Sequence, residues 1–185
     1  MVQNESNFTC PWWLLFTFDN PMRKLIHNPN RILRPYVNAG NKVMDIGCGM
    51  GYFSLELARL VGPNGKVIAA DLQPEMLAGL EKRSNKAGLQ SVIQPHLCTP
   101  KMIGVTEPLD MIFAFWMVHE VSDRTAFMQE LYSLLKPDGI LFIVEPIIHV
   151  TRKNFETTLD LGCEIGFSEI SHPQVAISRS VIFLK

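Results

Sequence analysis

The sequence predicts an α/β protein in which a mostly parallel sheet carries helices on both faces. Short runs rich in Val, Ile and Leu alternate with segments of helical periodicity, as buried parallel strands alternate with their crossover helices. A turn with three glycines joins the first of these runs to the first helix. Two strand-like segments near the C-terminus meet at Pro173 with no room for a helix, which predicts an antiparallel pair. The sheet is therefore expected to have seven strands, the last of them antiparallel.

Each element follows from local signals. Pro74 stands where a first helical residue is favoured, and Gly88 stands where a helix ends. Pro95 has no backbone N–H to donate, so the strand that contains it is expected at an edge of the sheet. The expected strands are 43–46, 67–70, 92–97, 111–115, 140–144, 168–172 and 178–184, and the expected helices are 52–60, 74–86, 151–163 and one that Ser122 caps.

Length and composition argue against several classes of protein. The 185 residues suffice for one domain with a sizeable core, and a hydrophobic content of 47% argues against a disordered chain. A net charge of −1 gives no sign of the excess of basic residues that is typical of nucleic-acid-binding proteins. The four cysteines are dispersed, which argues against a disulfide framework or a zinc site and favours a reducing compartment. The N-terminus is polar and no apolar run approaches the ~20 residues of a membrane span, so we expect neither a signal peptide nor a transmembrane helix, and we expect a cytoplasmic protein.

The first 40 residues precede the regular alternation, and we expect them to form a lead-in with one or two short helices ahead of a domain over residues 41–185. Residues 10–18 are densely aromatic and include Trp12 and Trp13. Three roles fit this cluster: a cap that packs on the sheet, a lid over a substrate pocket, or a surface that docks on a membrane or a partner. In the third case nearby basic side chains would contact anionic lipid, namely Arg23, Lys24, Arg31 and Arg34.

Residues 43–54 organise the chain around a close backbone turn. They carry the pattern D-x-G-x-G-x-G, formed by Asp45, Gly47, Gly49 and Gly51. Glycine reaches backbone angles closed to other residues and lets a ligand touch the main chain. The N-terminus of the helix that follows favours a carboxylate or a phosphate. The dinucleotide fingerprint G-x-G-x-x-G is not matched, because Tyr52 stands in place of its third glycine.

This turn resembles the first motif of the class I S-adenosylmethionine-dependent methyltransferases, and the resemblance covers residues 30–185. It implies the Rossmann-like fold of that family, with S-adenosylmethionine as the cofactor. The loop from Gly47 to Tyr52 would then pass beneath the methionine part of the cofactor. Asp45 would lie close to the cofactor's amino group.

An adenosyl ligand also needs partners for its ribose and adenine. Asp71 ends the second expected strand, where it can accept both ribose hydroxyls or else cap the next helix. Leu72 would face one side of the adenine. Family members often place an acid after the third strand, near the adenine amino group, but this chain has His96, Leu97, Cys98 and Thr99 there. Thr99, or a backbone carbonyl near Cys98, would therefore have to bind the adenine.

Residues 109–121 resemble the fourth motif of small-molecule methyltransferases of the quinone-biosynthesis type, known as methyltransferase type 11. In this segment Phe115 ends a strand and is expected to contact the cofactor. His119 occupies the first position of the family's histidine pair, and Glu120 replaces the second. A neutral imidazole can take a proton from a hydroxyl or an acidic carbon, so His119 is either a general base or a structural histidine. The N-P-P-[YF] signature is absent, which argues against amide-nitrogen and adenine acceptors.

Two acidic residues near this segment have alternative roles. Glu120 would orient His119 or stabilise the start of the next helix, where a negative charge suits the helix dipole. Glu145 ends the fifth expected strand, where it would contact substrate or hold the N-terminal lid by hydrogen bonds.

These residues together predict a methyltransferase with a small, apolar or aromatic acceptor. The expected substrate contacts are Trp12, Trp13, Trp116, Glu120 and Glu145, and no metal is expected. Methyl transfer from a sulfonium needs alignment, exclusion of water and sometimes removal of one proton, so it requires no covalent nucleophile. Two other functions compete. A nicotinamide oxidoreductase is disfavoured by the glycine spacing, whereas a silent cofactor-binding or membrane-peripheral accessory protein fits the replaced histidine.

Overall fold

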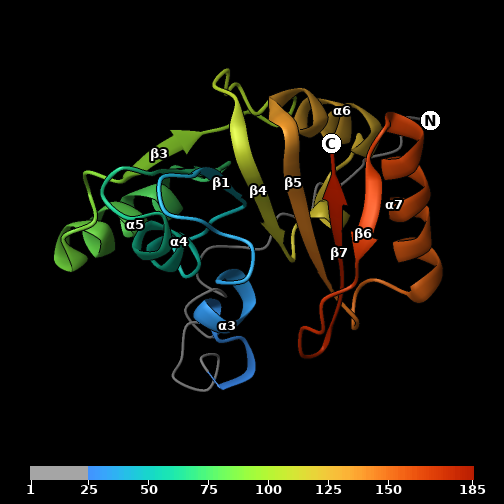
Figure 1. Cartoon of the computed structure of the whole chain (residues 1–185), viewed down its shortest axis with the longest axis horizontal. Helices are drawn as coiled ribbons and strands as arrows, with labels where there is room; N and C mark the ends of the chain where they lie inside the picture. The colour runs from blue at the N-terminus through green and yellow to red at the C-terminus, as the bar shows by residue number, and fades with distance from the viewer. Residues whose placement is uncertain (1–24) are drawn as a thin grey trace, which may run out of the picture.

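The computed structural model describes residues 25–185 and is built on one sheet of seven strands (Figure 1). Their order across the sheet is β3-β2-β1-β4-β5-β7-β6. The strands are β1 (Lys42–Ile46), β2 (Lys66–Asp71), β3 (Ile93–Leu97), β4 (Leu109–Phe115), β5 (Leu135–Pro146), β6 (Ser168–Ser171) and β7 (Ser178–Leu184). β7 runs antiparallel to both β5 and β6, and the other neighbouring pairs are parallel. The expected mostly parallel sheet with an antiparallel last strand is confirmed.

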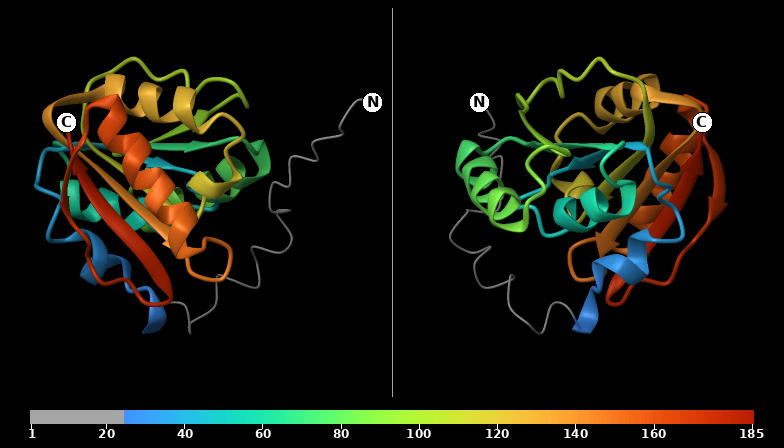
Figure 2. Two further views of the ribbon diagram at one scale, coloured as in Figure 1. Left: turned by 90° about the vertical axis from the view of Figure 1, so that its right-hand side faces the viewer. Right: turned by 60° about the vertical axis from the view of Figure 1, so that its left-hand side comes forward.

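Helices cover both faces of this sheet, as expected (Figure 2). One face carries α3 (Pro29–Leu33), α4 (Ser54–Val61) and α5 (Pro74–Ala87), and the other carries α6 (Arg124–Leu134) and α7 (Arg152–Ile165). Leu57 of α4 and Leu80 of α5 are fully buried in the first layer, and Leu131 of α6 is fully buried in the second. The central strands are therefore covered from both sides, which explains their nearly continuous apolar sequences.

The strand order reverses between β1 and β4, and open α/β sheets bind their ligands at such a switch point. Met44 of β1 lies opposite Ile68 of β2 on one side and Ile112 of β4 on the other, all in parallel register. The carboxyl ends of the three strands consequently meet at one edge of the sheet, which we call the carboxyl edge. The glycine turn and the segments that follow β2 and β4 all leave the sheet there.

Local signals explain most element boundaries, with one exception. Gly88 ends α5 in the left-handed conformation, with a φ of 68°. The expected cap at Ser122 is wrong, because α6 begins at Arg124 and Asp123 caps it. The Oδ1 atom of Asp123 accepts the Ala126 N–H at 2.9 Å. Serine and aspartate cap helices about equally well, so two adjacent candidates could not be separated by residue type.

The position of one strand in the sheet agrees with the sequence-based expectation, and the start of another does not. β3, which contains Pro95, pairs with β2 alone and is an edge strand, as expected. β5 begins earlier than expected, because Leu135 pairs with Leu109 and residues 136–139 belong to the strand. After a shift in register, Ile140 lies opposite Met111.

The lead-in is described from residue 25 onward, and this part of it packs on the sheet. Leu33 is fully buried in the same apolar layer as Val43 of β1. The domain boundary at residue 40 stays a prediction. Trp12 and Trp13 lie outside the described residues, so the cap, lid and docking roles of the aromatic cluster stay predictions as well. Over residues 25–185, no helix combines the length and apolar character needed to cross a membrane.

Candidate active site

The turn after β1 has the backbone that its glycines predict. Gly47, Gly49 and Gly51 adopt φ values of 72°, 53° and 82°, where a side chain would strain the chain. A Cβ atom at Gly51 would lie 2.2 Å from Leu80 Cδ1, and one at Gly47 would lie 2.8 Å from Met117 Cγ. Among the described residues, no atom comes within 4 Å of a Cβ at Gly49. The outer glycines therefore let α5 and the segment after β4 close on the turn, while Gly49 leaves the main chain open.

Asp71, at the end of β2, holds its carboxylate against this turn. Its Oδ2 accepts the Gly49 N–H at 2.8 Å, and its Oδ1 accepts the Gln73 N–H at 2.9 Å at the start of α5. Burial raises the pKa of Asp71, and the backbone N–H donors oppose that rise. The Leu72 N–H also interacts with this carboxylate, which has about four acceptor positions and so retains capacity for a further hydroxyl. Helix capping and ribose binding, the two roles expected for Asp71, are thus compatible.

Exposed apolar side chains surround Asp71 on the side of β3. Leu72 is 44% exposed, Leu97 lies opposite Asp71 in the β2–β3 register, and Met102 follows in the next loop. Large apolar side chains exposed beside a polar anchor suit a flat aromatic base. Leu72 was expected here and Leu97 was among the candidates after the third strand, whereas Met102 was missed. A loop methionine carries no sequence signal that separates a ligand contact from core.

Cys98 and Thr99 shape this side of the site through backbone contacts. The Cys98 N–H donates to the Asp71 carbonyl at 2.9 Å. Burial, together with the negative charges of Asp71 and Glu130, raises the pKa of the Cys98 thiol to about 12, so the thiol stays neutral. The Thr99 hydroxyl donates to the Met102 carbonyl at 3.2 Å and closes a short turn. Recognition of adenine by either residue stays a prediction.

Asp45 lies within β1 and is almost completely buried. The Ser54 hydroxyl, at the first residue of α4, donates to Asp45 Oδ2 at 2.5 Å. This bond ties the strand to the helix on the far side of the glycine turn and fixes the conformation of the turn between them. Contact of Asp45 with the amino group of a cofactor stays a prediction.

Aromatic side chains fill the end of β4. Phe115 is buried and packs on Phe53 and Trp116, with ring centroids 4.5 and 5.2 Å away. Trp116 has a φ of 59°, a strained value for a residue other than glycine. Its indole N–H donates to Ser178 Oγ at 2.9 Å, which holds the strained residue in place. The burial of Phe115 makes it a wall of the site, and its contact with a cofactor stays a prediction.

Tyr52 and His27 join the lead-in to the site. The Tyr52 hydroxyl donates to the His27 carbonyl at 2.9 Å. His27 Nε2 lies 2.9 Å from the Ala176 carbonyl and, since a carbonyl only accepts, carries the hydrogen. The His27 ring packs edge-on against Trp116, with centroids 5.0 Å apart. His27 was not among the expected site residues, because nothing in its local sequence distinguishes it.

His119 and Glu145 form a hydrogen-bonded pair at the carboxyl edge. His119 Nδ1 lies 2.5 Å from Glu145 Oε2, and the His119 backbone N–H donates to Oε1 at 3.1 Å. The Glu145 side chain is 2% exposed and the His119 side chain 21% exposed. Burial by itself lowers the pKa of His119, but the hydrogen bond and charge of Glu145 outweigh burial and raise it. The pair therefore holds a basic imidazole with one nitrogen fixed and part of the ring accessible.

The two acids differ in their relation to His119. Glu120 is exposed in the short 3-10 segment Val118–Glu120, and it lies outside α6, which begins at Arg124. Its charge helps to raise the pKa of His119, but Glu145 makes the orienting contact. Both oxygens of Glu145 are engaged by His119, an interaction that neither expected role of Glu145 included. Contacts of Trp116, Glu120 and Glu145 with a substrate stay predictions.

The carboxyl edge thus combines two functional parts. The open main chain at Gly49, the spare acceptor capacity of Asp71 and the exposed Leu72 fit the methionine, ribose and adenine parts of S-adenosylmethionine. Met117 packs on Gly47, so the segment that carries His119 lies directly against the cofactor turn. Within residues 25–185, no three His, Cys, Asp or Glu side chains gather so that they could hold a metal ion.

Known proteins resemble this chain in sequence and in fold. The chain matches a family model described as a methyltransferase domain over residues 37–164. It is 33% identical to a demethylmenaquinone methyltransferase of Lactobacillus johnsonii, over 71% of this chain and 52% of the relative. It is 32% identical to a ubiquinone biosynthesis O-methyltransferase of Xanthomonas euvesicatoria, over 71% of this chain and 54% of the relative. The chain therefore spans about half the length of these curated relatives.

A solved structure extends the likeness to the whole fold. A SAM dependent methyltransferase from Aquifex aeolicus is 25% identical and superposes with a TM-score of 0.84, covering 95% of this chain and 99% of that one. The chain and this protein thus share one overall fold.

Proposed function

The chain belongs to the methyltransferase domain family, and we propose that it transfers a methyl group from S-adenosylmethionine to a small, apolar or aromatic acceptor that carries an ionisable proton. The family match covers the glycine turn, Asp71 and His119. The observation that carries the proposal is the His119–Glu145 pair beside the cofactor turn. It supplies a basic group at the place where the methyl acceptor would lie.

The chemistry divides between cofactor and protein. When bound, S-adenosylmethionine supplies an electrophilic methyl group, so the protein has to align the acceptor and remove its proton. A carboxylate only accepts hydrogen bonds, so Glu145 holds the hydrogen of His119 on Nδ1 and leaves Nε2 with a free lone pair. Nε2 takes the acceptor's proton, and the Glu145 carboxylate stabilises the imidazolium that forms.

The aromatic residues at the end of β4 favour an aromatic acceptor. Phe115 and Trp116 form an apolar wall at the end of β4, and tertiary contacts hold Trp116 in its strained conformation. The two curated relatives are named for demethylmenaquinone and for ubiquinone biosynthesis. A phenolic hydroxyl or an activated carbon of a reduced quinone ring combines the flat shape and the ionisable proton that this site suits.

Two measurements test this function. Purified protein is incubated with methyl-labelled S-adenosylmethionine and a panel of phenols and reduced quinones, and binding of S-adenosylhomocysteine is measured by calorimetry. His119→Ala should lower turnover by about 10²–10⁴-fold, the usual contribution of a general base, while retaining the affinity for S-adenosylhomocysteine. Unchanged turnover would remove His119 from the mechanism. Tight binding of S-adenosylhomocysteine with no methyl transfer to any member of the panel would instead favour a silent accessory protein.

A further inference from the structure

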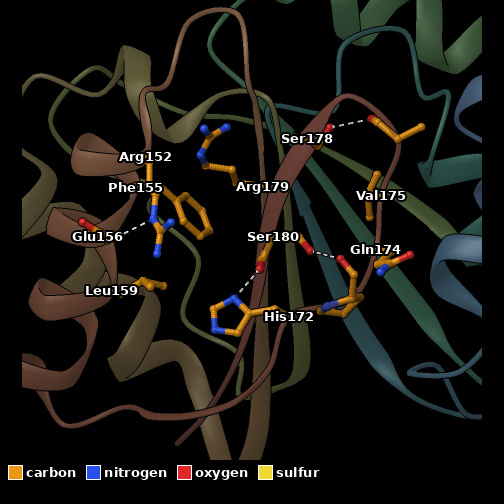
Figure 3. A pocket seen from close by; sticks show the side chains of 12 residues that line it. Arg152, Phe155, Glu156, Leu159, His172, Gln174, Val175, Ser178, Arg179 and Ser180 are labelled. Carbon is orange, nitrogen blue, oxygen red and sulfur yellow. Dashed lines mark hydrogen bonds and ion pairs between the residues drawn. The ribbon is translucent and has the colours of Figure 1, made fainter.

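A groove opens between α7 and the loop that joins β6 to β7, with β7 at its base (Figure 3). Its volume is about 820 Å³, within the range of roughly 300–1,000 Å³ of small-molecule pockets. Phe155 and Leu159 of α7 and Val175 of the loop form its apolar lining. Arg152 and Arg179 supply the positive charges.

The groove exists because β6 is short. β6 pairs only with the last residues of β7, from Ile182 to Leu184, so the first half of β7 has no strand on its outer side. The loop covers the exposed edge instead: His172 Nδ1 donates to the Ser180 carbonyl at 2.8 Å, and the Ser180 hydroxyl donates to the Pro173 carbonyl. The loop and α7 thereby become two separate walls, and Figure 3 shows Phe155 and Leu159 on one side of β7 and Gln174 and Val175 on the other.

The charges in the groove do not cancel. Arg152 Nε pairs with Glu156 at 2.9 Å, and His172 pairs with Glu169 at 2.6 Å. Arg179 is partly buried and makes no ion pair with any residue of the described part of the chain. Glu145 lies opposite Arg179 in the β5–β7 register, but His119 engages both of its oxygens. The Arg179 guanidinium therefore lies beside an apolar lining without an ion pair among residues 25–185.

The groove adjoins the methyl-transfer site. Ser178 lines the groove and also accepts the indole N–H of Trp116 at the end of β4. Arg179 follows Ser178 on β7, directly across from Glu145. A ligand whose reacting part lies near His119 could therefore extend past Trp116 along β7.

We propose that this groove binds a carboxylate-bearing arm of the methyl acceptor, an inference that rests on the proposed function. The Arg179 guanidinium pairs with the carboxylate, because its planar donors match the two carboxylate oxygens. Phe155, Leu159 and Val175 contact an apolar stem that links the carboxylate to the methylated part. The acceptor is accordingly an acidic amphiphile.

Equilibrium binding of a fluorescent probe tests the groove without any methyl transfer. The probe is 11-(dansylamino)undecanoic acid, and its methyl ester is the uncharged comparison. The wild-type protein should bind the acid about 10- to 100-fold more tightly than the ester, the usual range for a hydrogen bond to a charged group. Arg179→Met should abolish this preference, and Arg179→Lys should restore part of it. Arg59→Met, which removes an exposed arginine from the opposite face, should keep the full preference.

Failure of this inference is separable from failure of the proposed function. Affinity for S-adenosylhomocysteine is measured for each variant, since an unchanged value shows that the fold and the cofactor site are intact. Equal binding of acid and ester by the wild type, or a preserved preference in Arg179→Met, would overturn the carboxylate site. A preference for the acid that depends on Arg179, with no methyl transfer to any acceptor, would support the groove and refute the proposed function.

Discussion

Replacing Glu145 by glutamine examines the proposed base most directly. Glu145→Gln preserves the shape of the side chain but removes its charge. The amide oxygen can still accept the His119 backbone N–H, and the amide nitrogen then donates to Nδ1. This arrangement places the ring hydrogen on Nε2, the nitrogen that has to take the proton. Because the wrong tautomer removes the base, turnover should fall by about 10²–10⁴-fold, as expected for loss of general-base catalysis.

Turnover should increase with pH. Glu145 raises the pKa of His119 against the effect of burial, so wild-type activity should rise with pH through a midpoint above the usual value of about 6.5. In Glu145→Gln the burial remains and the carboxylate is gone. The pKa of His119 and the midpoint of residual activity should therefore move below that of the wild type. A titration of the His119 ring by NMR measures the shift independently of turnover.

The contribution of His119 to the free energy of unfolding should decrease as the pH rises, whereas turnover increases. A group whose pKa is higher in the folded state stabilises the fold fully below its unfolded pKa, about 6.5 for histidine. This stabilisation is lost as the pH rises through the higher folded pKa of His119. Urea denaturation below the unfolded pKa of His119 and above its folded pKa measures this effect. The difference in the free energy of unfolding between the wild type and Glu145→Gln should be smaller at the higher pH.

The matched control removes a carboxylate at a distance from the site. Glu107 pairs with Lys42 and Lys66 at the start of β1 and β2, the end of the sheet opposite the carboxyl edge. Glu107→Gln should leave both turnover and the pH midpoint as in the wild type. The reasoning fails if Glu145→Gln keeps wild-type turnover, or if the pKa of His119 does not fall.

Three further substitutions examine the cofactor side. Gly51→Ala adds a methyl group 2.2 Å from Leu80 Cδ1 at a φ of 82°, and should lower the free energy of unfolding by about 2–4 kcal/mol in urea denaturation. Gly49→Ala, at an open position, should cost only the backbone strain of about 1–2 kcal/mol, so equal losses would contradict the packing argument. Asp71→Asn should weaken binding of S-adenosylhomocysteine by about 10- to 100-fold in calorimetry, because a carboxylate accepts the ribose hydroxyls better than an amide. Unchanged affinity would refute ribose binding by Asp71.

The cofactor side of the site was largely predictable from sequence, because its signals are local. Three glycines within five residues have positive φ, and Asp71 ends the next strand at the same edge of a parallel sheet. Met102 was missed, because the exposure of a side chain depends on what the rest of the chain covers. The cap of α6 was misplaced by one residue for a similar reason, since both Ser122 and Asp123 suit the role.

The acid–base pair could not be predicted, because it depends on register between strands. Phe115 of β4 lies opposite Val144 of β5, so the segments after these residues leave the sheet together and bring His119 to Glu145 across 26 positions of sequence. The local sequence pattern does not determine which residues of neighbouring strands lie opposite each other. Sequence signals pointed to His119 alone and assigned Glu145 other roles.

By itself the sequence determined the fold class and the cofactor turn, because hydrophobic period, glycine conformation and helix signals act over a few neighbouring residues. The tertiary structure alone decided which acid orients His119 and that the Arg179 side chain makes no ion pair within the described residues. Both outcomes arise from the pairing of β5 with its neighbours, which places side chains of distant segments side by side. Strand pairing is a property of the whole sheet, and no single stretch of the chain encodes it.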